Sequence, residues 1–166
     1  MNLRAPIAAA ALATLAACGS TDTATTYTLT TGTYAVSGAT ANPADQCGLL
    51  PAFQAIGKAI DVAVVGTSVG FDLGQNGIAA TIPYATLNGN SIEQPVEASY
   101  TANSGSCVLR IRRTVTGELN GNDDATLLMH ATIADDGSGT ACTIGDLPAG
   151  ATAFPCTTDL HFLVRK

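Results

Sequence analysis

The chain has 166 residues, which is the size of one domain. Charged residues make up only 12% of it and the formal net charge is −6, so its seven basic residues do not supply the large patch that nucleic-acid binding needs. No apolar run reaches the roughly 18 uninterrupted residues of a transmembrane helix, which argues against a retained membrane span. Gly and Thr are plentiful and Lys is scarce, which is atypical of a helical bundle.

The first residues have the layout of an export signal. Arg4 supplies a positive charge, residues 5–17 are small and almost wholly apolar, and small residues precede Cys18. A charged start, a short apolar stretch and small residues before a cleavage point are typical of a secretory signal peptide. The segment Leu15-Ala16-Ala17-Cys18 resembles the lipobox of bacterial lipoproteins. The alternative for Cys18 is a buried thiol after an Ala-rich helix.

The lipoprotein resemblance implies that residues 1–17 are removed and that Cys18 becomes an acylated N-terminus. Each buried methylene adds about 0.8 kcal/mol, so several acyl chains such as palmitate give stable membrane anchoring. Gly19 stands where inner-membrane lipoproteins of enteric bacteria commonly carry Asp, which favours the outer membrane. Residues 18–26 then form the lipidated Cys and a flexible tether, because they are small, polar and without apolar periodicity. We expect residues 27–166 to form a single disulfide-bonded β domain.

Four further cysteines remain at Cys47, Cys107, Cys142 and Cys156. An even number in an exported chain indicates disulfides, and four cysteines allow three connectivities. We expect Cys142 to pair with Cys156, because they bracket a loop rich in Gly, Pro and Ala, and Cys47 to pair with Cys107. The alternative is a zinc site, which the absence of a Cys-x-x-Cys pair disfavours.

Alternation of apolar and polar residues predicts most of the secondary structure. The later strands are predicted at 92–101, 107–116, 125–133 and 159–165. The earlier strands are predicted at Tyr27–Ser37, Ala59–Gly66, Val69–Leu73 and Ile78–Tyr84. Turn residues separate them at Gln75-Asn76-Gly77, Asn88-Gly89-Asn90, Asn120-Gly121 and Asp136-Gly137. One short helix is predicted near residues 43–57, beginning at Pro43 and interrupted by Pro51 and Gly57.

The parity of the apolar positions limits how the last strands can pair. The strands around Ile111 and Met129 both bury odd-numbered residues. If these strands pair, the numbers of two residues opposite one another must have an even sum, and the loop at Asn120-Gly121 must then contain an odd number of residues. The last strand buries even-numbered residues such as Phe162, which requires an odd sum with the Met129 strand. His130 and His161 then share the outer face. Arg113 breaks the pattern, because it joins the apolar face of its strand.

About eight short strands predict an all-β antiparallel meander, either a closed barrel or a two-sheet sandwich. Gly32-Thr33-Tyr34 on the first strand and Arg165 on the last are similar to the calycin superfamily, which includes lipocalins and some bacterial protease inhibitors. In calycins a Gly-x-Trp on the first strand packs under an Arg on the last, and Tyr34 stands here in place of Trp. The resemblance favours the barrel over the sandwich.

The interior of such a barrel has two possible roles. Its lining includes Leu109, Ile111, Met129 and Phe162. These side chains can either surround a small apolar ligand or fill the core themselves. The filled core is the favoured interpretation, since small barrels pack their interiors with side chains.

One segment has the letters of a hydrolase motif. Gly66-Thr67-Ser68-Val69-Gly70 matches the nucleophile elbow, which needs a strand before the Ser and a helix after it. Two glycines and an Asn-Gly turn follow, which make a poor helix. A turn between two strands is therefore the favoured interpretation of Ser68.

Other polar groups have both a functional and a structural interpretation. His130 and His161 with Asp159 have ligand types that suit a metal, but a solvated outer face explains them as well. The acidic pairs Asp123-Asp124 and Asp135-Asp136 lack the spaced ligand loop of a calcium site and are favoured as turns. The carboxylates of Glu93 and Glu97 lie too far apart along a strand for a glycosidase, and they face Arg110 and Arg112 in a predicted salt-bridged face rather than an anion site.

No set of nucleophile, base and orienting residue lies in the sequence surroundings that its catalytic role requires. We therefore expect no enzyme activity, no metal, no cofactor and no nucleic-acid partner. The sequence predicts a monomeric, lipid-anchored outer-membrane protein of the bacterial cell envelope. We expect it to act as a non-catalytic binding or interaction module for a small apolar ligand or an envelope protein. The alternatives are an envelope serine hydrolase that uses Ser68 and a purely structural surface protein.

Overall fold

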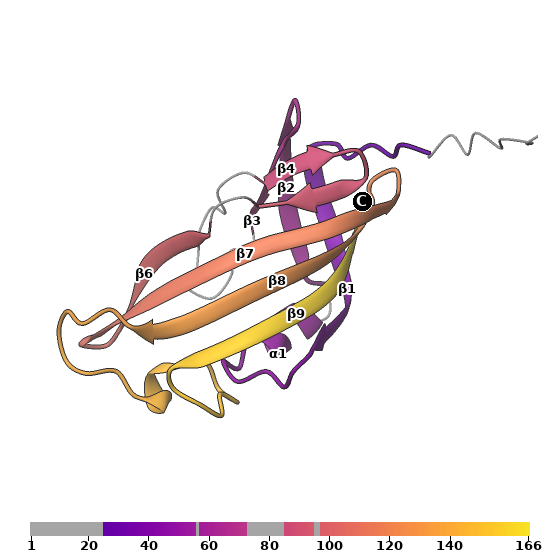
Figure 1. Ribbon diagram of the computed structural model, residues 1–166. Helices are drawn as coiled ribbons and strands as arrows, with labels where there is room; N and C mark the ends of the chain where they lie inside the picture. Colours follow the sequence, from indigo (N-terminus) through magenta and orange to yellow (C-terminus); the bar gives the residue numbers. More distant parts are fainter. Residues whose placement is uncertain (1–24, 56, 73–84, 95–96) are drawn as a thin grey trace, which may run out of the picture.

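The computed structural model describes residues 25–55, 57–72, 85–94 and 97–166 (Figure 1). Within these residues, nine antiparallel strands form one sheet in the order β5-β4-β3-β2-β1-β9-β8-β7-β6. The sheet closes on itself because β5 also pairs with β7. The predicted all-β antiparallel barrel is therefore confirmed, and the sandwich is excluded.

The strands and the two short helical segments occupy the following residues. The first five strands are β1 (Gly32–Ala41), β2 (Ala59–Val65), β3 (Ser68–Asp72), β4 (Ala85–Asn88) and β5 (Ser91–Glu93). The last four are β6 (Ala98–Ser104), β7 (Cys107–Gly121), β8 (Asp124–Asp135) and β9 (Cys156–Arg165). One helical turn, α1 (Leu50–Gln54), and one 3-10 turn, η1 (Ile144–Asp146), lie in the connections.

Closure of the barrel depends on β7, whose single edge serves two partners. Its last residues pair with β5, where Ile92 lies opposite Gly117, and its first residues pair with β6. The buried Gln94 lies at the change of partner, where its Oε1 accepts a hydrogen bond from the Val115 N–H at 2.9 Å. The strand predicted over 92–101 is thus wrong as one continuous element. The sequence has Pro95 at this point, and proline cannot donate to a strand ladder.

Other predicted boundaries are corrected near the amino end. The first strand begins at Gly32 rather than Tyr27, because residues 25–31 bond to turns of other strands instead. The helix is a single turn with Pro51 in its first turn, so Pro43 does not start it. The Asp45 carboxylate accepts the Leu50 N–H at 2.6 Å. The strand expected at 78–84 and the turn at 75–77 lie outside the described residues, and β4 was not predicted.

The parity argument is confirmed for the long strands. Val115 lies opposite Met129, and Met129 opposite Leu160, which gives the even and the odd sums that the apolar positions require. The odd-length loop predicted at Asn120-Gly121 is wrong, because these residues end β7 and the turn consists of the two residues Asn122-Asp123. An irregularity in the ladder between Leu119 and Gly121 changes the sum of paired residue numbers from even to odd at this point. Asp123 adopts φ 54°, the left-handed conformation that Asp tolerates in tight turns.

Side chains fill the barrel interior in two hydrophobic clusters. The larger cluster includes Tyr34, Phe71, Met129 and Phe162, and the smaller one includes Leu109, Ile111, Ile133 and the four cysteines. The predicted lumen residues are buried, with exposed fractions of 5% or less. Between the clusters, Arg113 and Thr158 are buried on either side of Ala131, which confirms the inward position predicted for Arg113.

The four cysteines form two disulfides, but the expected pairing is wrong. Cys47 pairs with Cys156 at a sequence separation of 109, and we call this the long-range disulfide. Cys107 pairs with Cys142 at a separation of 35, and we call this the short-range disulfide. Nearness in the chain was a poor guide, because the loop 136–155 first runs beside the start of β7, which brings Cys142 to Cys107 (Figure 1). The Asp136 N–H donates to the Val108 carbonyl, and the Thr140 N–H donates to the Ser106 carbonyl.

The barrel has two different ends. At one end lie residues 25–31 and the turns at 66–67, 89–90 and 122–123, and we call it the strap end. At the other end lie both disulfides and the loop 136–155, and we call it the disulfide end. The 15-residue strand β7 runs from one to the other, a span of about 50 Å.

Candidate functional site

Residues 25–31 cross the strap end, and we call them the strap. Asn90 binds the strap with both groups of its side-chain amide: Oδ1 accepts the Tyr27 N–H and Nδ2 donates to the Thr25 carbonyl, each at 2.8 Å. Asn122 accepts the Thr28 N–H at 3.0 Å and the Thr28 hydroxyl at 3.1 Å. Two hairpin turns therefore supply the partners that a neighbouring strand would supply in a sheet.

Below the strap, a polar network joins Thr30 and Tyr34 to Asp123 in the β7–β8 turn. The Asp123 carboxylate accepts hydrogen bonds from the Thr30 N–H at 2.7 Å, the Thr30 hydroxyl at 2.8 Å and the Tyr34 hydroxyl at 2.6 Å. Lys166 donates to the Thr30 hydroxyl at 2.8 Å and to the Thr31 carbonyl at 2.9 Å. The ammonium also lies 5.9 Å from the centre of the Tyr34 ring, within the range of a cation–π contact.

The environment shifts the pKa of both acidic groups in this network. Burial raises the pKa of the Tyr34 hydroxyl, and its hydrogen bond to Asp123 adds to that rise. The same hydrogen bond is the main reason that the pKa of the Asp123 carboxyl lies below its usual value, and the Thr30 donors and Lys166 act in the same direction. The network is therefore built for an ionised Asp123 and a protonated Tyr34.

The residues that carry the calycin resemblance, Tyr34 and Arg165, lie in different surroundings. Tyr34 is fully buried on the first strand. Arg165 faces outward, where its Nε donates to the Asp124 carboxylate at 2.9 Å and its Nη2 bonds to the same oxygen. The cation over the Tyr34 ring is Lys166, one residue further on.

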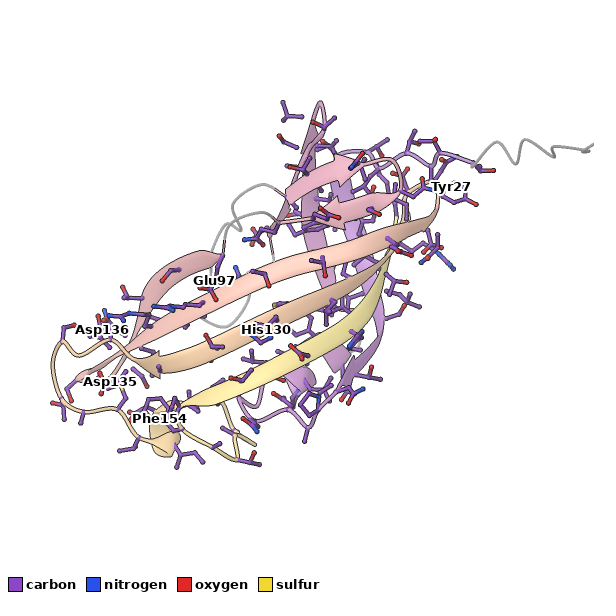
Figure 2. All side chains as sticks on the ribbon, in the orientation of Figure 1. Tyr27, Glu97, His130, Asp135, Asp136 and Phe154 are labelled. Atoms are coloured by element: carbon purple, nitrogen blue, oxygen red, sulfur yellow. A yellow bond between two sulfur atoms is a disulfide. The ribbon has the colours of Figure 1, made fainter. Side chains whose placement is uncertain are left out.

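The acidic pair at the disulfide end caps its own turn. Asp135 accepts the Gly137 N–H and the Cys142 N–H, each at 2.8 Å, and these bonds lower the pKa of its carboxyl. Asp136 accepts from the Ser138 N–H and hydroxyl at 2.7 Å, while Arg110 donates to the Asp136 carbonyl at 2.9 Å. Asp123-Asp124 forms the bonds described above, so the turn interpretation of both pairs is confirmed. Figure 2 labels Asp135 and Asp136 at the end opposite Tyr27 of the strap.

The two histidines share the outer face, as predicted, but are not opposite one another. His130, labelled in Figure 2, lies on β8. It lies opposite Asp159 and bonds to its carboxylate through Nδ1 at 2.5 Å, whereas His161 lies opposite Leu128. In the described part of the chain, no three His, Cys, Asp or Glu side chains lie close enough together to hold one metal ion. The three residues therefore do not form the metal site that their types allowed.

Ser68 and the charged residues of the outer face take structural positions. Ser68 begins β3, directly after the turn at Gly66-Thr67, and lies between Val65 and Thr86 in the sheet. A strand follows it rather than a helix, which confirms the turn interpretation of the Gly-x-Ser-x-Gly letters.

The predicted salt-bridged face is formed only in part. Arg112 lies 3.9 Å from Glu97, with both side chains nearly half exposed, while Arg110 bonds to the loop instead of to a glutamate.

The strap and its partners were missed at the level of sequence. Asn90 was predicted only as a turn residue and Asn122 was not singled out, because no local pattern says that their side chains bind a segment some 65 or 94 residues away. The predicted acylation residue Cys18 and the signal 1–17 lie outside the described residues. Among those described, no helix has the length and apolar character needed to cross a membrane. No protein-family model, no curated protein and no solved structure matches this chain.

Proposed function

We propose that the protein is an outer-membrane lipoprotein of the bacterial cell envelope, anchored through Cys18, and that it acts as a non-catalytic interaction module for an envelope protein. The observation that carries this proposal is the filled barrel interior. The side chains that would line a ligand chamber are instead packed against one another in two hydrophobic clusters. Recognition then falls to the outer surface of the barrel.

The disulfides support the envelope location. Four cysteines are paired in two bonds, and such bonds persist in oxidising compartments such as the bacterial periplasm. The signal-like residues 1–17 and the lipobox-like Leu15-Ala16-Ala17-Cys18 supply the export route and the anchor. The strap fixes the folded chain from Thr25 onward, so the barrel begins only a few residues after Cys18.

The anchor is tested by labelling with palmitate in a bacterial host. We expect the label in the wild type and in Ser20→Ala, a matched change just beyond the lipobox, and no label in Cys18→Ala. Density separation of the membranes should place the labelled protein with the outer membrane. An unlabelled wild type would overturn the anchor.

The non-catalytic assignment is tested by a fluorophosphonate probe and by native mass spectrometry. We expect no covalent labelling and a bare mass that matches the chain with two disulfides. Labelling that disappears in Ser68→Ala would revive the serine hydrolase. A small molecule that co-purifies with the protein and is lost on denaturation would contradict the proposed protein partner and favour ligand binding in the barrel instead.

A further inference from the structure

The position of the strap decides which end of the barrel is held near the membrane, given the anchor at Cys18 proposed above. Asn90 fixes the chain at Thr25, so only residues 19–24 separate the acylated residue from the folded barrel. Fully extended, the chain from Cys18 to Thr25 spans at most about 25 Å. The strap end can therefore never lie far from the bilayer surface, whereas the disulfide end lies about 50 Å further along β7.

The strap end also presents an exposed apolar side chain. Val65 is 68% exposed, which is unusual for a side chain of its size, and it ends β2 at the tip of the β2–β3 hairpin. The hairpin tip is held beside the strap, because the Val64 N–H donates to the Thr31 hydroxyl at 2.9 Å. Val65 thus lies on the same end of the barrel as the point where the tether enters.

The polar groups around Val65 suit a bilayer surface. The strap and the nearby turns present hydroxyl and amide side chains, among them Thr67, Asn90 and Asn122. The charged groups of the β7–β8 turn are neutralised nearby: Asp124 pairs with Arg165, and Lys166 lies close enough to Asp123 to lower the pKa of its carboxyl. Bringing this end toward lipid headgroups leaves both of these contacts intact, although the exposed Glu118, opposite Ser91, also lies at this end.

The disulfide end has the opposite character. Three acidic residues, Asp135, Asp136 and Asp146, lie in or beside the loop 136–155, against the cation Arg110, which bonds to this loop. The whole chain carries a formal net charge of −6. Anionic lipids repel such a surface over roughly a Debye length. Electrostatics therefore favours the orientation that keeps this loop away from the membrane.

From these observations we infer that the strap end rests on the bilayer, with the Val65 side chain in the interfacial layer, and that the disulfide end projects away from it. The tip of the β2–β3 hairpin at Val65 therefore contacts a lipid surface, and the short tether holds the tip there. This inference deepens the proposed function, because it makes the disulfide end the part of the molecule that an envelope partner meets first.

The absence of tryptophan from the chain allows a direct test. The mature chain, residues 18–166, is coupled through the Cys18 thiol to a maleimide phospholipid in vesicles of phosphatidylcholine and phosphatidylglycerol. Single tryptophans are introduced as Val65→Trp at the strap end and Ile144→Trp in the loop at the disulfide end, where Ile144 is 46% exposed. Quenching by brominated acyl chains then reports which tryptophan touches lipid.

We expect brominated lipid to reduce the emission of Val65→Trp roughly twofold, because an interfacial side chain lies about 5–10 Å into the boundary of headgroups and acyl chains. The emission of Ile144→Trp should not change. Equal quenching of both tryptophans, quenching of Ile144→Trp alone, or quenching of neither would overturn the orientation. Thr67→Trp, on the same exposed tip, provides a second probe if Val65→Trp does not fold.

The role of the strap is tested on the same vesicles. Asn90→Ala together with Asn122→Ala removes both amide anchors and should lower the quenching of Val65→Trp, because the tether then lengthens by the released strap. Ser91→Ala, beside Asn90 in the sequence, is the matched control and should leave it unchanged. Since the coupling is chemical, none of these results depends on acylation in the cell, which the palmitate experiment answers separately.

Discussion

Removing one hydroxyl from the network below the strap should destabilise the barrel in a way that depends on pH. Tyr34→Phe keeps the fully buried ring but deletes the hydroxyl that lies 2.6 Å from the Asp123 carboxylate. A hydrogen bond to a charged group contributes about 1.5–3 kcal/mol to stability. Two Thr30 donors remain on the carboxylate and part of it is solvated, so we expect a loss near the lower end, about 1.5 kcal/mol.

The pH dependence follows from the lowered pKa of Asp123. A carboxyl whose pKa is lower in the folded than in the unfolded chain stabilises the fold above the unfolded value, near pH 4. That contribution is lost as the pH falls through the lower, folded value. The Tyr34→Phe defect should therefore be complete at pH 7 and should shrink well below pH 4, where Asp123 is protonated in both states.

The measurement is urea unfolding followed by far-ultraviolet circular dichroism, with the disulfides kept oxidised. At pH 7 the free energy of unfolding of Tyr34→Phe, extrapolated to zero urea, should lie about 1.5 kcal/mol below that of the wild type. Tyr27→Phe is the matched control, because the Tyr27 hydroxyl has no hydrogen-bond partner within the described chain. An equal loss at pH 7 and at low pH would show that the hydroxyl does not act through the carboxylate, and no loss at pH 7 would refute the reasoning altogether.

Three further outcomes follow from the strands and the bridges. Gly117→Ala places a Cβ 2.3 Å from the Thr126 carbonyl oxygen and should cost about 1–3 kcal/mol by urea unfolding, whereas in Gly121→Ala the nearest contact is 3.7 Å and the cost should be negligible. Gln94→Met leaves the Val115 N–H unsatisfied and should cost about 1–3 kcal/mol, and an unchanged unfolding midpoint would contradict the role given to that amide. Replacing the long-range disulfide by alanines should cost about 1 kcal/mol more than replacing the short-range one, because it closes the longer loop. Peptide mapping without reduction checks both pairings.

Local sequence patterns predicted the long strands well. β7, β8 and β9 each alternate over ten or more residues, so their buried positions, their parity and the shared outer face of His130 and His161 followed from period two alone. The inward position of Arg113 followed for the same reason. In these strands the buried and exposed positions of the barrel alternate with the same period as the apolar and polar residues of the sequence.

The features that failed are set by contacts between distant segments. The strand predicted over 92–101 divides because Gln94 replaces a backbone partner of β7, which no alternation reveals. The disulfide pairing depends on the path of the loop 136–155, whose first residues bond to the backbone at Ser106 and Val108, and no spacing of cysteines reveals that contact.

The same limit applies to the candidate surface at the strap end. Asn90 and Asp123 were predicted only as turn residues, and Asn122 was not predicted at all. Their partners Thr25, Thr28 and Thr30 are far away in the sequence. A turn prediction explains the backbone at these positions. It does not say that their side chains bind another segment.

The connectivity of the disulfides has a consequence for how the protein matures. The first cysteine of the barrel joins the last, and the two between them join each other, so the long-range disulfide links cysteines that are not consecutive in the chain. A chain that emerges amino end first presents Cys47 to an oxidant well before Cys156 exists outside the membrane. Rapid oxidation in order of appearance would yield the wrong pairs, and thiolate exchange would have to reshuffle them over seconds to hours. Given the export proposed above, we therefore expect that removing the disulfide isomerase of the host lowers the yield of the native protein more than that of a protein with consecutive bonds only.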